Sequence, residues 1–486
     1  MHRFLSFVTI VFVFSRLLFP NYAPFIQDEP LLQQRVDRLF AEGHLPGLGL
    51  KGTQPIPYGP FPLWIYACVR LFGDSVAALI LAQGILQITG LGFLFAALIR
   101  LFGKRWALPA LLVVASSPYL FFYARLAWDN TFLYLFSSIL IWLTVRILEF
   151  LWEGKDPARV WWIGLGLSIA LCLGTHLMVI PFLGSVIGAV AVVRRRKVTV
   201  SGRLRFAFGS AFLACLLLLC PYLFSILTQI SSLSGASPHG SLFLIPGILA
   251  RMGELTTPAN FVDYFLDRRQ LQGSTILDIS AVAAVFQWLW ALTHVSMSAY
   301  VLFSVVSNRR DWSVLSVCIA LGVLTVFSQA VFYAISGHYE HPHYFHYTQW
   351  FSCLIAGSLL YDPATRPLGR RVVGVLVALN LFFLCGVTSF LFRHGGTRAV
   401  QVGTLAIHQA AVVKSLCEST DAGRVELDIS AVRIFPISLE YFFSREPACR
   451  NKALQISHSA PWRLTYADTP HGSAVLQVVR VGEASP

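Results

Sequence analysis

Long apolar runs separated by short polar loops make up most of the chain. A membrane-spanning helix needs about 20 apolar residues. By that measure the runs predict about eleven spans, near residues 3–20, 75–102, 106–122, 130–148, 161–175, 177–193, 205–228, 281–306, 312–335, 346–361 and 372–392. The fifth and sixth spans share one run that is broken at 174–176 and again at Pro181, which predicts a tight helical hairpin. The pattern therefore predicts an all-α polytopic membrane protein.

Composition and charge agree with this prediction. The chain is 56% hydrophobic and only 13% charged, which excludes a soluble globular protein. Much of the positive charge lies in short loops that share one side of the membrane, at 104–105, 194–197, 309–310 and 370–371. Because Lys and Arg in short loops mark the cytoplasmic side, the net charge of +13 sets the topology and requires no nucleic-acid partner.

The opposite, extracytoplasmic side then receives every segment that suggests chemistry. These segments are the loop at 21–63, the turn around Asp129, the segments 229–280 and 336–345, and the tail. We expect a multi-pass membrane protein whose functional segments lie on the extracytoplasmic face. Residues 1–392 would form the membrane part, and residues 393–486 would form a soluble lobe.

The tail differs in character from the rest of the chain. HQAAVVKSLCEST is helix-like, whereas RVELDISAVRIF, WRLTY and SAVLQVVRV have the β-branched content of strands. We therefore expect a small α/β lobe. Cys417 and Cys449 are its two cysteines, and an oxidising compartment is compatible with a disulfide between them.

The loop at 21–63 is the first long polar interruption of the chain. DEPLLQQRVDRLFAE has apolar residues at helical spacing, and an acidic start with Pro30 in its first turn, so we predict a surface helix. PLWIYACVRLFG predicts a second one. Asp28 and Glu29 at the start of the first helix serve equally well as a helix cap and as a catalytic pair. A carboxylate at this face can act as a general base toward an acceptor hydroxyl, and a departing lipid phosphate would then need only a cation.

Several other polar residues are candidates for substrate binding. Asp129 lies in the second loop with Arg125 one turn before it, and either binds sugar or acceptor or forms an ion pair that steadies the turn. Lys51, like Arg268, Arg269 and Arg393, is a cation that could attract an anionic lipid head; a solvated surface charge is the alternative.

Histidines gather in SGHYEHPHYFHYTQW, at 338, 341, 343 and 346, with Glu340 among them. Metal ligation is one interpretation, because His and carboxylate suit zinc, although the spacing matches no metal-binding motif. The interleaved aromatic residues fit an interfacial belt instead. A histidine there could donate to a lipid phosphate. His176, at the tip of the predicted hairpin, has the same option, with simple packing as the alternative.

Three stretches carry a resemblance to a known family: QDEP after the first span, YGPFPLWIYACVRLFGDSVAALI, and SSPYLFFYARLAWDNTF. In this order they resemble the GT-C glycosyltransferases that use polyprenyl-phosphate sugars, in the branch of the protein O-mannosyltransferases and the lipid A aminoarabinose transferase. The resemblance covers roughly residues 5–195. It implies a GT-C fold and an inverting, metal-independent transfer without a cofactor, with Asp28 as base and Glu29 beside it.

The chain departs from that family at three places that the resemblance puts near donor or acceptor. Tyr58-Gly59 stands where Lys is frequent, Thr175-His176 where Thr-Lys is frequent, and His343-Tyr344 where Arg-Tyr is typical. Our hypothesis is a glycosyltransferase of a bacterial inner membrane, with its active site on the extracytoplasmic face, that moves a sugar from a polyprenyl phosphate to an extracytoplasmic lipid, glycan or protein. The alternatives are a transporter or flippase of lipid-linked saccharides, and a binding module formed by the tail on a membrane scaffold.

Overall fold

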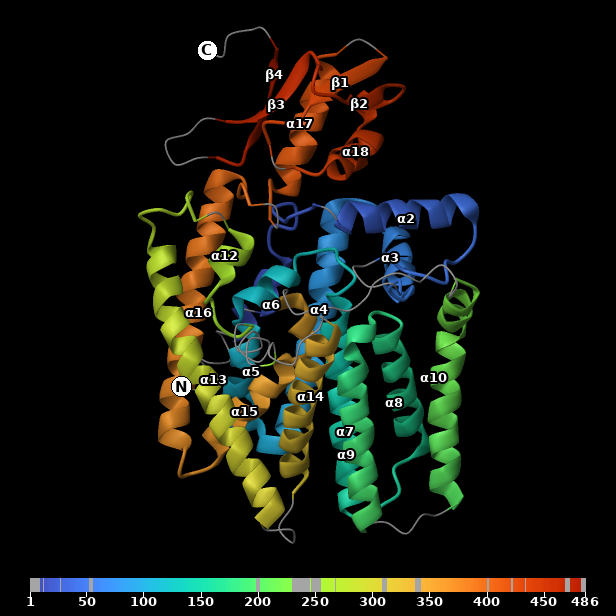
Figure 1. The fold of residues 1–486 in the computed structure, drawn as a ribbon, viewed down its shortest axis with the longest axis vertical. Helices are drawn as coiled ribbons and strands as arrows, with labels where there is room; N and C mark the ends of the chain where they lie inside the picture. Colours follow the sequence, from blue (N-terminus) through green and yellow to red (C-terminus); the bar gives the residue numbers. More distant parts are fainter. Residues whose placement is uncertain are drawn as a thin grey trace.

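The computed structural model describes most of the chain. The described residues are 9–11, 13–26, 28–51, 56–197, 202–229, 245, 255–266, 268–307, 313–336, 342–399, 402–420, 423–432, 434–467 and 473–481. Within them the chain forms a bundle of long helices, with a small α/β lobe at one end (Figure 1).

The bundle contains most of the apolar runs. Its helices are α4 (Val76–Phe102), α5 (Lys104–Ala115), α6 (Pro118–Tyr123), α7 (Phe132–Trp152), α8 (Arg159–Leu173), α9 (Ile180–Lys197), α10 (Gly202–Gln229), α13 (Thr275–Ser307), α14 (Val314–Ser336), α15 (Gln349–Tyr361) and α16 (Arg366–His394). Among the described residues six helices are long and apolar enough to cross a membrane: α4, α7, α10, α13, α14 and α16. The protein is therefore a membrane protein, but the count of eleven spans is not confirmed.

Two predicted spans differ for identifiable reasons. The run at 106–122 divides into α5 and α6 because Ser117 accepts a hydrogen bond from the Leu120 amide and so caps a new helix. The run at 346–361 begins as a 3-10 turn, η5 (Pro342–Thr348), so that α15 has only 13 residues. The first predicted span, 3–20, lies partly outside the described residues.

The predicted hairpin breaks where expected but is not a closely packed pair. α8 ends before Gly174, a short turn η2 (Leu177–Val179) follows, and α9 begins at Ile180. α8 packs mainly against α10 and α7, whereas α9 packs mainly against α14 and α7. The two helices therefore diverge around α7.

Two helices cover the end of the bundle that carries the lobe. α2 (Asp28–Glu42) and α3 (Phe61–Arg70) coincide with the two predicted surface helices. α2 lies across the bundle direction, between the bundle and the lobe (Figure 1). It buries Leu32 and Val36 and exposes Arg38, as expected for an amphipathic helix. Much of the segment 229–280 falls outside the described residues. Within its described part, α12 (Phe261–Phe265) is a short helix with Phe261 and Phe265 buried.

The lobe follows α16. It consists of α17 (Ala406–Glu418), β1 (Arg424–Asp428), α18 (Pro436–Arg445), η6 (Pro447–Cys449), β2 (Ala453–Ile456), β3 (Trp462–Tyr466) and β4 (Leu476–Arg480). The strand order is β2-β1-β3-β4, with β1 parallel to β2 and β3, and with β4 antiparallel to β3. The predicted helix and three predicted strands are confirmed, whereas α18 and β2 were not predicted.

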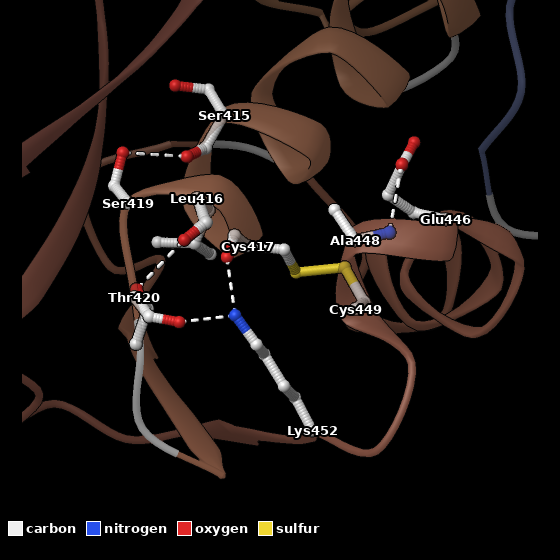
Figure 2. Close-up of a disulfide and its surroundings, with 9 residues drawn as sticks. All are labelled: Ser415, Leu416, Cys417, Ser419, Thr420, Glu446, Ala448, Cys449 and Lys452. Atoms are coloured by element: carbon white, nitrogen blue, oxygen red, sulfur yellow. Dashed lines mark hydrogen bonds between the residues drawn. A yellow bond between two sulfur atoms is a disulfide. The ribbon is translucent and has the colours of Figure 1, made fainter.

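A disulfide joins α17 to η6 within the lobe. Cys417 and Cys449 form it, with their Cα atoms 5.2 Å apart (Figure 2). Beside it the Lys452 ammonium donates to the carbonyl of Cys417 at 2.6 Å and to that of Thr420. These contacts fix the end of α17 to the chain that follows α18.

The lobe contacts the chain just before α2 through main-chain bonds. Pro24 forms an antiparallel bridge with Leu405, and the Ala406 amide donates to the Ala23 carbonyl at 2.9 Å. The Gln409 side chain donates to the carbonyl of Phe25 at 3.0 Å and to that of Thr404 at 2.7 Å.

A second group of contacts joins the lobe to α2 itself. Arg445 of α18 donates to both carboxylate oxygens of Asp37 at 2.8 and 2.7 Å, and Arg70 of α3 donates to the same carboxylate. The ring of Tyr441 lies 4.7 Å from that of Phe25. We refer to Gln409, Arg445 and Tyr441 with these partners as the lobe clamp, since they hold the segment that leads into Asp28.

Candidate active site

Asp28 and Glu29 occupy the first turn of α2. Their side chains differ in exposure: Asp28 is partly exposed, whereas Glu29 is 3% exposed. A Glu29 carboxyl oxygen accepts from the Ile26 amide at 3.3 Å, and the Asp28 carboxyl is hydrogen-bonded to the side chain of Trp128. Glu29 therefore helps to begin the helix, while Asp28 contacts the second loop.

Asp129 reaches the same place from the turn between α6 and α7. It is 2% exposed, and its Oδ1 accepts from the Asn130 amide at 2.8 Å. Its Oδ2 is buried and has no hydrogen-bond partner. The charges of Asp28 and Glu29 both act on it. The fold thus brings together three carboxyl groups from two loops that the sequence separates by about 100 residues.

Burial controls the protonation of this carboxyl cluster. Burial, followed by the charge of Asp28, raises the pKa of Glu29 to about 8. Burial, followed by the charge of Asp28, likewise raises the pKa of Asp129 to about 8. Burial raises the pKa of Asp28 as well, but the hydrogen bond to Trp128 opposes it. Three neighbouring carboxyls cannot all ionise, so Asp28 is the one best placed to carry the negative charge at neutral pH.

Four buried amide side chains border the carboxyl cluster. Gln33 lies one turn after Glu29 on α2, Gln83 and Gln87 lie on α4, and Asn130 follows Asp129. Each is at most 1% exposed. We call these four residues the amide cluster.

The amide cluster was missed by the sequence analysis. A signal existed, because Gln83 and Gln87 occupy positions i and i+4 of an otherwise apolar span, and polar residues inside spans are seldom without a role.

Arg125 serves the backbone of the first loop. Its guanidinium donates to the carbonyls of Leu18, Phe19 and Tyr22 at 2.5, 2.6 and 3.1 Å. Burial lowers its pKa to about 10, which leaves it protonated. Among the described residues it forms no ion pair with Asp129, so the ion-pair interpretation was wrong. Arg125 instead ties the second loop to the chain that leads to Asp28.

Two of the places where the chain departs from the family lie side by side. The ring of Tyr58 lies 4.1 Å from that of His176. The Gly59 amide donates to the Thr175 carbonyl at 3.4 Å, and a Cβ on Gly59 would lie 1.9 Å from the Gly174 carbonyl oxygen. Only glycine permits this close approach.

His176 lacks the charge that would attract a phosphate. Its Nδ1 accepts from the Met178 amide at 3.1 Å, and burial lowers its pKa to about 3. Lys51 is the exposed cation beside this pair, since its neighbour Leu50 accepts from the Tyr58 amide at 2.9 Å.

The histidine-rich turn is described only in part. His338, Glu340 and His341 lie outside the described residues, as do the side chains of His343 and Tyr344, whose backbone belongs to η5. Among the residues that are described, no group of three or more His, Cys, Asp or Glu could hold a metal ion.

His346 is described, and it lies behind the carboxyl cluster. It is buried, and its ring lies 3.8 Å from that of Tyr123, which stacks on Trp128. Burial lowers the pKa of His346 to about 3. Trp128, which binds the Asp28 carboxyl, is thus backed by Tyr123 and a neutral imidazole.

A cleft of about 660 Å³ separates the lobe from the start of α4. Its lining includes Asn21, Asp74, Ser75, Tyr441 and Arg445. The cleft therefore borders both the first loop and the lobe clamp.

Comparison with known proteins gives a family match and a shared fold. Residues 54–224 match the family described as dolichyl-phosphate-mannose-protein mannosyltransferase. ArnT from Cupriavidus metallidurans bound to undecaprenyl phosphate is 13% identical with a TM-score of 0.54, over 95% of this chain and 92% of that one. Its apo state gives the same identity and TM-score over 94% and 86%.

Other comparisons add less. An Archaeoglobus fulgidus oligosaccharyltransferase is 12% identical with a TM-score of 0.48, over 93% of this chain and 62% of its own. No curated protein sequence matches the chain. The resemblance drawn from the sequence is confirmed: the chain has the fold of ArnT, a GT-C glycosyltransferase, and matches the mannosyltransferase family over residues 54–224.

Proposed function

We propose that the protein is an inverting membrane glycosyltransferase that moves a sugar from a polyprenyl phosphate to a hydroxyl of an extracytoplasmic acceptor. The convergence of Asp28, Glu29 and Asp129 from two loops carries this proposal. It is supported by a fold shared with a protein whose structure contains undecaprenyl phosphate. The family match points to the same class of lipid-phosphate sugar donor.

In the proposed step Asp28 acts as general base. Its carboxylate takes the proton of the acceptor hydroxyl while the hydroxyl oxygen attacks the anomeric carbon from the face opposite the phosphate. The bond from that carbon to the phosphate oxygen breaks, and polyprenyl phosphate leaves with the electron pair. One carbon–oxygen bond forms as another breaks. Because the hydroxyl attacks from the face opposite the leaving phosphate, the anomeric configuration inverts.

The other two carboxyls serve a different purpose in this proposal. With pKa values of about 8, Glu29 and Asp129 keep their protons at neutral pH and add no negative charge beside the departing phosphate. Environments that push the pKa values of neighbouring carboxyls apart are a common way to assign them different roles. The leaving phosphate needs no acid, and exposed Lys51 is the cation that would receive it.

Placement of the site outside the cytoplasm rests on two features. Short basic loops mark the opposite face, and the lobe contains a disulfide, which persists in oxidising compartments. The acceptor would approach through the cleft between lobe and α4, which opens beside the first loop. We therefore assign the protein to a bacterial inner membrane.

The test is sugar transfer by purified, reconstituted protein. Undecaprenyl phosphates that carry different labelled sugars are supplied with an envelope extract, with and without chelator. We expect free undecaprenyl phosphate to be released in step with transfer of label to an acceptor, with inverted configuration and without loss in chelator. Movement of the intact lipid across proteoliposomes without cleavage would instead identify a transporter.

A further inference from the structure

The amide cluster has no part in the step described above, and it gathers unpaired polar atoms beside the carboxyl cluster. Both side-chain polar atoms of Gln33 and of Asn130, Nε2 of Gln83 and Oε1 of Gln87 are buried without a hydrogen-bond partner. Buried polar groups are otherwise nearly always paired. Six unpaired amide atoms in one place indicate a site prepared for a polar ligand.

Contacts join the amide cluster to the carboxyl cluster. The Tyr66 hydroxyl donates to Oε1 of Gln83 at 3.2 Å, and the charges of Asp129 and Glu29 both act on Tyr66. The Gln87 amide donates to the Thr131 carbonyl at 3.0 Å, two residues after Asp129. Gln33 follows Glu29 by four residues on α2. The two share a face of this helix, because residues i and i+4 lie on the same side. The two clusters therefore form one site.

The chemistry of the amide cluster suits hydroxyl groups. An amide both donates and accepts, as a hydroxyl does, and a protonated carboxyl can also do both. The cation within the second loop, Arg125, already donates to three backbone carbonyls. In the proposed step Lys51 is engaged by the lipid phosphate, so an anionic sugar would meet the negative Asp28 without a further cation to offset it.

From this arrangement we infer that the amide cluster binds the sugar of the lipid-linked donor and selects sugars that carry hydroxyls and no anionic group. This inference rests on the proposed function, and it assigns Gln33, Gln83, Gln87 and Asn130 as residues that determine sugar specificity.

Binding without turnover tests the inference separately from catalysis. The background is Asp28→Asn protein, which should bind donor without consuming it. The probes are undecaprenyl phosphate that carries glucose, mannose or glucuronic acid, and undecaprenyl phosphate alone. Gln33→Leu and Asn130→Leu are compared with Gln34→Leu, a control on the partly exposed neighbouring position of α2.

We expect the two cluster variants to weaken binding of the glucosyl or mannosyl lipid by about tenfold, the effect of losing one or two hydrogen bonds. The two variants should bind the bare lipid as before, and the Gln34→Leu control should bind bare and sugar-bearing lipid as before. The glucuronosyl lipid should bind at least tenfold more weakly than the glucosyl and mannosyl lipids. Because Leu removes amide atoms that have no partner, thermal stability should not fall.

An equal loss for bare and sugar-bearing lipid, no loss for either, or equal binding of the glucuronosyl lipid would overturn the inference. Sugar-selective binding in a protein that never transfers sugar would refute the proposed function and leave the inference standing.

Discussion

Glu29 and Asp129 make folding dependent on pH. Their ordinary pKa values of 4.5 and 3.8 rise to about 8 in the folded protein. Between about pH 4.5 and 8 the folded state holds protons that the unfolded state has released, so the free energy of unfolding decreases as pH rises through this window. Below it both states are protonated, and the full stability is present.

Replacing either side chain by its amide removes this dependence. Glu29→Gln and Asp129→Asn should therefore raise Tm relative to the parent protein at pH 8.5 and raise it much less at pH 5. The measurement is thermal unfolding in detergent at both pH values, with Glu42→Gln, an exposed position at the end of α2, as control. A change in Tm of the same size at both pH values would contradict the assignment of raised pKa values.

The sequence predicted these residues unequally. Asp28 and Glu29 were found because two adjacent carboxylates directly after an apolar run stand out, whether they cap a helix or take part in chemistry. Gln33, Gln83 and Asn130 were not found, because each is an uncharged residue that suggests no chemistry alone and their convergence depends on the packing of α2, α4 and the second loop. The partners of Arg125 were missed for the same reason, since backbone carbonyls leave no trace in a sequence.

Among the elements, α2 matched its prediction to the residue, whereas α5 and α6 did not. Pro30 and two acidic residues define the start of α2, and Gly43, with φ of +70°, ends it. The break between α5 and α6 was missed because the flanking residues are apolar, although Ser117 before Pro118 is a local signal for the start of a helix. A tertiary contact, the hydrogen bond from Ser117 to the Leu255 carbonyl, also holds this turn.

The lobe clamp connects the elements α17 and α18 to α2 and to the segment that leads into Asp28. Gln409→Leu and Arg445→Leu should lower kcat by about tenfold, since small displacements of a catalytic group have effects of this size or larger. KM for the lipid donor should change little, because neither side chain contacts the carboxyl or the amide cluster in the structure.

Steady-state kinetics of both variants test this, with Arg450→Leu at an exposed position of the same lobe as control. Arg445→Lys should recover part of the activity. Loss of Tm without a fall in kcat, or a rise in KM alone, would show that the lobe clamp does not position Asp28.

At the scale of the whole molecule, the lobe lies over the two surface helices as a cover (Figure 1). The sequence predicted the lobe, because strand-like segments follow the last apolar run. It predicted the extracytoplasmic side for the lobe from the basic loops on the opposite side. It could not predict how the lobe docks. The bridge from Pro24 to Leu405 joins segments at opposite ends of the chain, and no local pattern encodes such a pairing.

The disulfide should stabilise this cover. Reducing it, or replacing both cysteines by serine, should lower the free energy of unfolding of the lobe by about 4 kcal/mol, since Cys417 and Cys449 are 32 positions apart in the sequence. Transfer activity should fall as well, because a destabilised lobe would loosen the lobe clamp. Thermal unfolding and activity with and without dithiothreitol measure both effects, and reductant should leave the double-serine variant unchanged. Full activity of reduced protein would argue against a positioning role of the lobe.

The central claim is that Asp28 removes the proton of the acceptor. The most direct measurement is the single-turnover rate of undecaprenyl phosphate release by Asp28→Asn, compared with the parent protein and with Glu42→Gln. We predict a rate at least 100-fold lower for Asp28→Asn, with donor binding and Tm retained, and a parent-like rate for Glu42→Gln. Release by Asp28→Asn at a rate near that of the parent would contradict the account.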